Sequence, residues 1–345
     1  RVVDVCARCR TVVEPTDATA VETDVIVYNL GLNDGVGGPF VNVDVVDLEL
    51  LPGVVAVAVP PGHDASGASA RMPLGRDVPV IVDDDAAAPW LVIPAHNSAA
   101  LDFARRQNLT PLPVLNLDGT VVVEGPLAGL ARFAARAAAS EIVAAEGAIA
   151  YEVAASVDQL RCGRCATSLV PVLGWHWFLR TADLEVAAAD AMRSGDVVLD
   201  DVDARDRFVD RAERADSWCL SHQVWAGDAV PAARCTDCGQ VAVTAAPSSS
   251  CGKCMGELVS TEDVLDARFV AALWPLAHAG WPDDERAPAE AAPTTTVFAS
   301  PDDITGFALP VAALGLRLAG VVPFGELVCV RVPNGQDGNS DPAQP

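Results

Sequence analysis

The sequence is poor in several features, and each shortage limits what the protein can be. Lysine occurs once, at Lys253, so 22 of the 23 basic residues are arginine. No run of 18 uninterrupted apolar residues is present, which argues against a membrane-spanning helix. Nothing near Arg1 follows the basic, apolar, small-residue order of a secretion signal. We therefore expect a cytoplasmic protein that does not contact a membrane.

The composition is that of a globular but strongly acidic chain. Hydrophobic residues fill 51% of the 345 positions and charged residues 20%. This length predicts two or three domains at about 100–200 residues each. The 47 acidic residues outnumber the 23 basic ones, which gives a formal net charge of −24. Such a chain repels polyanions, so it would hold nucleic acid only through a strongly segregated patch of arginines.

Cysteines are the most informative residues, because eight of the ten stand in C-x-x-C pairs and only Cys219 and Cys329 are left over. Each pair places two thiolates on one tight turn, which suits tetrahedral zinc. Buried small cysteines or a thioredoxin-like redox pair are the alternatives. Because thiolates would fill all four positions, zinc at such sites would be structural. The predicted ligand sets are Cys6, Cys9, Cys162 and Cys165, and Cys235, Cys238, Cys251 and Cys254.

The two predicted sets differ in the length of chain that they close. In the second set, 12 residues separate Cys238 from Cys251, which is enough for a short ribbon that includes Thr244–Ser250. In the first set, 152 residues separate Cys9 from Cys162. Because the entropy of loop closure grows only logarithmically with length, such a site is feasible. It would clamp the two ends of an inserted domain.

Hydrophobic patterning predicts strands in the first half of the chain and helices later. Between Val25 and about Leu115, short β-branched runs are separated by turns, which favours a small β-rich barrel or sandwich. Pro288–Pro293 and the tail from Pro333 read as loops. The predicted strands are 25–28, 54–59, 78–82, 90–93 and 295–298, and the predicted helices are 130–146, 181–194, 204–215, 261–279 and 304–318.

Several segments, in order, resemble the middle of a valyl-tRNA synthetase, a class I enzyme of the valine, isoleucine and leucine group. Residues 217–227 (SWCLSHQVWAG) resemble its D-W-x-I-S-R-Q-x-W-W-G. Residues 261–269 (TEDVLDARF), with ALWP at 272–275 and GWP at 280–282, resemble its D-E-D-V-L-D-T-W-F-S-S-A-L-W-P and later G-W-P. The resemblance extends to 94–96, 104–109, 303–304 and 323–324, and both cysteine sets fall where some family members carry zinc.

The resemblance implies an α/β fold. It would be part of a Rossmann-type class I catalytic core, with an inserted β-rich editing-like domain and two zinc knuckle sites. The expected division is a stem with the first half of a knuckle (1–20), the editing-like domain (21–150), a return stem with the other knuckle half (151–216), a core segment with a zinc ribbon (217–290), the second half of the nucleotide-binding fold (291–330) and a tail (331–345).

The family joins valine to ATP with magnesium and then moves it to tRNA, using an H-I-G-H element and a lysine-bearing K-M-S-K-S loop. The five histidines form no H-x-x-H, and the only lysine lies between Cys251 and Cys254. The residues that follow Phe324, 327–340, do not resemble the loop. Within the matched stretches His222 stands in place of an arginine and Ala226 in place of a tryptophan. Asp303 matches an aspartate near the nucleotide, although helix capping is the alternative role.

The editing function of the family uses a threonine-rich segment and the pattern A-H-D-x-x-D, whose aspartate holds the amino group of the substrate. This chain has Asn97 and Ala100 at the two aspartate positions, and Val45–Leu50 where the threonines would lie. Because a methyl group cannot anchor an ammonium, the resemblance implies a lost editing site. His96 is retained, and a structural hydrogen bond is its alternative role.

These observations predict a truncated or degenerate homologue that keeps the zinc-stapled architecture and does not by itself activate valine. Its partners would be tRNA, an amino acid, a separate synthetase half or another protein. One alternative is an internal fragment of an active valyl-tRNA synthetase, with H-I-G-H in a preceding half. The other alternative is a free-standing deacylase of mischarged tRNA. Extending the reading frame in both directions would separate the first two hypotheses, and a deacylation assay would test the third.

Overall fold

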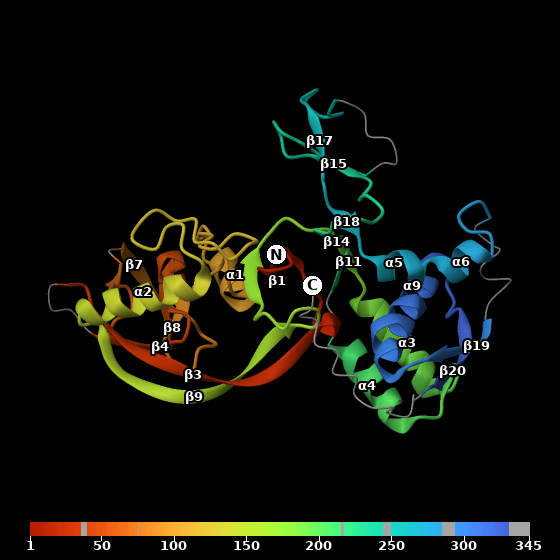
Figure 1. The fold of residues 1–345 in the computed structure, drawn as a ribbon, viewed down its shortest axis with the longest axis horizontal. Coiled ribbons are helices and arrows are strands. Elements are labelled where there is room, and N and C mark those ends of the chain that lie inside the picture. The colour runs from red at the N-terminus through yellow and green to blue at the C-terminus, as the bar shows by residue number, and fades with distance from the viewer. Residues whose placement is uncertain (36–39, 75, 215–216, 244–249, 285–293, 331–345) are drawn as a thin grey trace, which may run out of the picture. The chain divides into compact units, whose positions relative to one another are not determined.

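The structure, a computed structural model, describes residues 1–35, 40–74, 76–214, 217–243, 250–284 and 294–330. The chain divides into two compact units, Arg1–His176 and Trp177–Pro345 (Figure 1). The finer division into six ranges remains a prediction. The predicted loops at 288–293 and beyond Pro333, and the interval 244–249, lie outside the described residues. Among the residues described, no helix has the length and apolar character needed to cross a bilayer.

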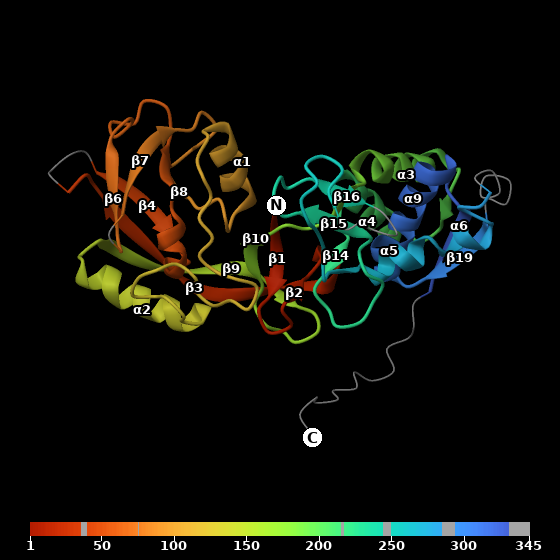
Figure 2. The same cartoon turned by 90° about the horizontal axis from the view of Figure 1, so that it is seen from above.

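Unit 1 begins with a small antiparallel sheet of order β10-β1-β2, from which a long two-stranded ribbon departs. In the ribbon β3 and β9 pair from Ala18↔Cys162 to Leu30↔Ile149, and Figures 1 and 2 both show the two strands side by side. The ribbon therefore connects the first cysteine set to the remainder of the unit. The bounds are β1 Val2–Cys6, β2 Thr11–Val12, η1 Pro15–Asp17, β3 Ala18–Leu32, β9 Ile149–Cys162 and β10 Val170–Leu173.

The body at the far end of the ribbon combines two sheets with two helices. β4 joins the ribbon in a sheet of order β4-β3-β9, and a second sheet has the order β6-β7-β5-β8. β5 and β7 are parallel, so the second sheet is mixed, and α1 packs beside β8 (Figure 2). The bounds are β4 Val41–Val45, η2 Leu48–Gly53, β5 Ala56–Val59, β6 Ser69–Met72, β7 Arg76–Val82, β8 Trp90–Val92, α1 Ser98–Arg106 and α2 Arg132–Ala145.

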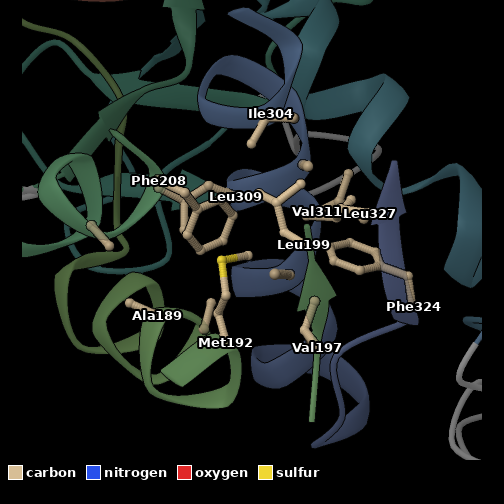
Figure 3. Packing of buried hydrophobic residues seen from close by; sticks show 14 of the residues in the cluster. Ala189, Met192, Val197, Leu199, Phe208, Ile304, Leu309, Val311, Phe324 and Leu327 are labelled. Atoms are coloured by element: carbon tan, nitrogen blue, oxygen red, sulfur yellow. The ribbon is translucent and has the colours of Figure 1, made fainter. Parts of the chain in front are cut away.

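Unit 2 is centred on a three-stranded parallel sheet of order β12-β20-β19, against which helices pack. Figure 3 shows Met192 of α3, Phe208 of α4 and Leu309 of α9 converging in its apolar core. The predicted strand at 295–298 lies within β19. The bounds are α3 Ala182–Ser194, β12 Val198–Leu199, α4 Val202–Glu213, β19 Thr294–Ala299, α8 Pro301–Asp303, the π-helical η3 Ile304–Ala308, α9 Leu309–Ala319 and β20 Phe324–Cys329.

The remaining elements of unit 2 bring together the segments that resemble the synthetase. β14 pairs with β18, so the 217–227 and 261–269 stretches lie side by side although about 40 residues separate them. A ribbon of order β16-β15-β17 carries the second cysteine set. The bounds are β11 Phe178–Arg180, β13 Ser217–Cys219, β14 Ser221–His222, β15 Ala232–Cys235, β16 Val241–Val243, β17 Leu258–Ser260, β18 Val264–Leu265, α5 Ala267–Ala272 and α6 Trp274–His278.

Two predicted helices are corrected by the structure. The segment 261–279 begins as strand β18, and α5 starts only after Asp266, whose side chain accepts the N–H of Arg268 as a helix cap. A break at Leu273 then separates α5 from α6. The helix predicted at 204–215 is shifted toward the N-terminus, because Asp201 caps α4 by accepting the N–H of Ala204 at 2.9 Å. Short polar side chains, which carry no apolar periodicity, decide both helix starts.

Candidate functional site

The first cysteine set forms one cluster in unit 1, as predicted. Cys6 and Cys9 lie at the turn between β1 and β2, and Cys162 ends β9. The sulfur atoms of all four cysteines lie within 4.8 Å of one another, with Cys6 Sγ 3.4 Å and Cys9 Sγ 3.7 Å from Cys165 Sγ. Four sulfurs at about 2.3 Å from one ion would be about 3.8 Å apart. The donor set therefore fits a tetrahedral metal ion.

The second cysteine set has the same arrangement on a local ribbon. Cys235 ends β15, and the sulfur pairs Cys235–Cys254 and Cys238–Cys251 are 3.4 and 3.7 Å apart. All four sulfur atoms again lie within 4.8 Å of one another, which fits one metal ion. Cys238 and Cys254 are exposed, whereas Cys235 and Cys251 are buried. With four protein ligands at each cluster, neither leaves a coordination position for a reacting water.

The surroundings of the thiols favour thiolate at Cys165 in the first set and at Cys235 and Cys251 in the second. Burial would raise the pKa of Cys165, but the hydrogen bonds to Thr167 and to the neighbouring thiols lower it to about 6. The backbone N–H groups of Lys253 and Cys254 lower the pKa of Cys251 to about 7. In contrast, burial and hydrogen bonds to other thiols raise the pKa of Cys9 to about 12. A metal that binds all four thiolates must therefore displace protons.

His96, at the centre of the editing-like residues, has both ring nitrogens engaged by the backbone. Val114 N donates to its Nε2 at 3.0 Å, so the proton lies on Nδ1, which donates to the Pro171 carbonyl at 2.7 Å. The side chain is buried, and this burial lowers the pKa of His96. His96 thus joins the body to β10, and no nitrogen is left for a substrate or a water molecule.

Asn97 and Ala100 also have structural contacts. Asn97 caps α1, since its Oδ1 accepts the N–H of Ala100 at 2.9 Å. Ala100 is completely buried in a small core with Val55, Val92 and Phe103. At the two positions where the family pattern has aspartate, this chain therefore has a helix-capping amide, Asn97, and a buried methyl group, Ala100.

A buried charge cluster that the sequence did not indicate lies beside these residues. Glu49, in the segment expected to be threonine-rich, is completely buried and accepts Arg132 Nε and Arg136 Nε at 2.8 Å each. Both arginines also bind Asp47, and Arg132 Nη1 donates to the Leu169 carbonyl at 3.0 Å. Burial alone would raise the pKa of Glu49, but the hydrogen bonds and charges of the two arginines lower it. A single acidic residue between leucines was the available signal.

Asp303, the predicted nucleotide contact, is exposed at the start of the helical segment that leads into α9. Ser300 Oγ donates to Asp303 Oδ2 at 2.7 Å and accepts the Asp303 N–H at 3.2 Å. Ser300 is therefore the N-cap of this helical segment, and Asp303, three residues later, holds the hydroxyl of the cap in place. Asp303 therefore supports the helix start as the partner of the capping Ser300 and is not itself the cap, and its nucleotide contact stays a prediction.

Asp266 organises the paired stretches 217–227 and 261–269. Its buried Oδ2 accepts Trp218 Nε1 at 3.2 Å, His222 Nε2 at 3.1 Å and Arg268 Nη2 at 3.3 Å. Burial alone would raise the pKa of Asp266, but the hydrogen bond from His222 and the charge of Arg268 lower it well below its usual range. A second link joins Gln223 Nε2 to Asp263 at 3.0 Å. His222, which replaces the family arginine, thus remains a hydrogen-bond partner within the pair.

Comparison with known proteins places this architecture in one family. Residues 1–339 match the family described as tRNA synthetases class I (I, L, M and V). A valine–tRNA ligase of Solibacter usitatus is 28% identical over 332 residues, covering 92% of this chain and 39% of that protein. A valine–tRNA ligase of Geobacter sulfurreducens is 29% identical over 342 residues, covering 95% of this chain and 38% of that protein.

The solved structure of an Agrobacterium radiobacter K84 LeuRS-tRNA-LeuAMS ternary complex shares 14% identity and a TM-score of 0.31, covering 91% of this chain and 40% of that one. The chain spans about two fifths of the length of the curated relatives that it matches. Because the family match extends over nearly every residue, the chain belongs to the class I tRNA synthetases of the isoleucine, leucine, methionine and valine group.

Proposed function

We propose that this segment is a valine–tRNA ligase homologue that keeps a zinc-stapled synthetase scaffold and does not by itself activate valine. Each cysteine cluster would hold one structural zinc ion. The parallel sheet of unit 2 would be half of a Rossmann-type core, and the body of unit 1 would be an editing-like domain. In the relatives, ATP, valine and tRNA would be the reactants of the whole enzyme, and magnesium would accompany the ATP. This chain would act by binding.

The observation that carries the proposal is the position of the only lysine. Forming an aminoacyl adenylate requires cationic groups that meet the developing charge on the triphosphate. Lys253 lies between two predicted metal ligands, and its backbone N–H donates to Cys251 Sγ at 3.4 Å. The lysine therefore belongs to a knuckle and not to a mobile loop. Since the chain also has no H-x-x-H, both of the family's ATP elements are missing from these residues.

The editing-like residues support the same conclusion for hydrolysis. Both ring nitrogens of His96 are hydrogen-bonded to the backbone. Asn97 caps a helix, and the methyl group of Ala100 is buried. None of the three offers a carboxylate to a substrate ammonium. A free-standing deacylase built on these residues would lack the group that anchors the aminoacyl end.

The test is ATP–pyrophosphate exchange with valine, combined with elemental analysis of zinc on the same purified chain. The expected result is two zinc ions per chain and no exchange above a protein-free blank. The valine–tRNA ligase of Geobacter sulfurreducens, assayed in parallel, provides the positive control. Measurable adenylate formation would refute the proposal. Deacylation of Val-tRNA or Thr-tRNA by the same preparation would instead favour the editing alternative.

The remaining alternative is that these residues are the internal part of an active valyl-tRNA synthetase. The relatives are more than twice as long as the stretch they share with this chain, which leaves room for both ATP elements. Sequencing the reading frame on both sides decides between the two. An H-I-G-H element before these residues and a lysine-bearing loop after them would favour the active enzyme.

A further inference from the structure

The first cysteine cluster assembles a group of arginines that the synthetase chemistry does not use. Arg8 lies between Cys6 and Cys9, and Arg161 and Arg164 flank Cys162. Because the four sulfur atoms lie within 4.8 Å of one another, the two turns that carry these arginines meet at one place. We call Arg8, Arg161 and Arg164 the basic knuckle.

Among the described residues, no carboxylate pairs with an arginine of the basic knuckle, although acidic residues outnumber basic ones by 47 to 23 in the sequence. Arg8 and Arg164 are exposed, and Arg161 is half-buried, with an Nε that is buried and has no hydrogen-bond partner. None of the three forms an ion pair with another residue of the described chain. Other exposed arginines of unit 1 do form ion pairs, for example Arg71 with Asp77 and Arg105 with Asp102, both at 3.2 Å.

The second cysteine cluster provides an internal comparison. Residues 1–10 and 161–164 contain five arginines and one acidic residue, Asp4. Residues 234–239 and 250–257, around the second cluster, contain Arg234 and Lys253 against Asp237 and Glu257. Both clusters offer four thiols. Counting also Asp17, whose carbonyl accepts the Gly163 N–H, and Asp118, which lies 4.0 Å from Arg10, the first cluster has five arginines against three carboxylates, whereas the second has two basic and two acidic residues. A metal bound by four thiolates would carry the same charge at both clusters. The need to neutralise that charge therefore does not explain why arginines gather only at the first cluster.

The net charge of −24 does not prevent this surface from attracting an anion. At physiological ionic strength the Debye length is about 8 Å, so acidic residues farther away are largely screened. An arginine guanidinium stays charged at any accessible pH, and its planar fork binds two phosphate oxygens at once. Three such groups on two adjoining turns offer more N–H donors than one small anion can accept, whereas a nucleic-acid strand presents one phosphate after another. Arg10 extends the same turn and approaches Asp118 at 4.0 Å.

We propose that the basic knuckle binds the phosphate backbone of nucleic acid, independently of base sequence. The choice of RNA over other polyanions rests on the proposed function. The three arginines would neutralise about three phosphates, and each neutralised phosphate contributes about 0.9 to the slope of log affinity against log salt concentration. The basic knuckle would thus be the segregated arginine patch that an acidic nucleic-acid-binding chain requires.

The experiment uses the full zinc-loaded chain and a fluorescein-labelled RNA hairpin of about 12 base pairs, with anisotropy titrations between about 50 and 200 mM KCl. The test variant is Arg8→Gln/Arg161→Gln/Arg164→Gln. The matched control is Arg71→Gln/Arg105→Gln/Arg106→Gln, which removes the same charge from other exposed arginines of unit 1. Losing three contacts should lower the slope of log affinity against log salt by about 2.7. The factor by which RNA affinity falls between about 50 and 200 mM KCl should then be about 40-fold smaller for the test variant than for the unmodified chain. The control should match the unmodified chain.

Several results would overturn the proposal. No binding by the unmodified chain, or an equal change in both variants, would show that the basic knuckle is not the binding surface. Loss of zinc from the test variant alone would assign the arginines to the metal cluster. Sedimentation that shows self-association of the unmodified chain, abolished by the test variant without RNA binding, would assign them to an acidic surface of a second copy. Because exchange and zinc content are measured separately, failure here is distinguishable from failure of the proposed function.

Discussion

The buried charge cluster around Glu49 allows a sharp test of what holds unit 1 together. Glu49→Gln keeps the shape of the side chain and removes its charge. The completely buried carboxylate receives hydrogen bonds at 2.8 Å from Arg132 and Arg136. Arg132 in turn donates to Leu169, which packs against the first cysteine cluster. The substitution therefore leaves the two guanidinium groups with only the partly exposed Asp47 as counter-charge and weakens a link between the body and the stem.

Removing one partner of a buried ion pair typically costs about 3–5 kcal/mol, a large part of the usual stability of a domain. We expect a loss in this range for Glu49→Gln, measured by urea unfolding. Asp77→Asn is the matched control, because the Asp77 carboxylate is 54% exposed and pairs with an exposed Arg71. Exposed pairs contribute about 0–1 kcal/mol. The control should therefore change the free energy of unfolding by at most about 1 kcal/mol.

The pH dependence provides a second check. The arginines hold the pKa of folded Glu49 below its ordinary value of 4.5, despite the opposing effect of burial. A lowered pKa in the folded state contributes stability that is present above about 4.5 and is lost as pH falls through the folded pKa. The difference in the free energy of unfolding between the unmodified chain and Glu49→Gln should therefore be constant from neutral pH to about 4.5 and become smaller below that pH. A variant within 1 kcal/mol of the unmodified chain at neutral pH would refute the reasoning.

The contacts of unit 1 and unit 2 give four further predictions. Ala100→Asp, which restores a family aspartate, buries a carboxylate among apolar side chains and should destabilise unit 1 by about 3 kcal/mol or more in urea unfolding. Asn97→Ala removes the cap of α1 and should lower the free energy of unfolding by about 1 kcal/mol in the same assay. Asp266→Asn should cost about 3 kcal/mol by the same assay, since Trp218, His222 and Arg268 lose their charged acceptor; a loss below 1 kcal/mol would contradict this. A strong zinc chelator should release two ions and increase amide exchange in β1, β10 and β15; unchanged exchange after metal release would contradict a structural role.

Features that depend on nearest neighbours were predictable. The C-x-x-C spacing identified both cysteine clusters, and the structure brings each set of four together. The strand at 295–298 and the helices at 130–146 and 181–194 follow from β-branched runs and apolar periodicity. The first part of the helix predicted at 261–279 was wrong, because strand pairing of Val264 with His222 outweighs periodicity there; the later part contains α5 and α6. The charge cluster at Glu49 was not predicted, because its partners lie more than 80 residues away.

The sequence by itself determined which chemical groups are available: eight paired thiols, one lysine within a knuckle, and no carboxylate at position 97 or 100. Only the tertiary structure decided how those groups are used. It engaged both nitrogens of His96 in backbone hydrogen bonds, and it brought together the sulfur atoms of two turns that 152 residues separate. The physical reason is that covalent geometry sets spacing along a few residues, whereas hydrogen-bond partners, burial and local charge depend on which distant segments pack together.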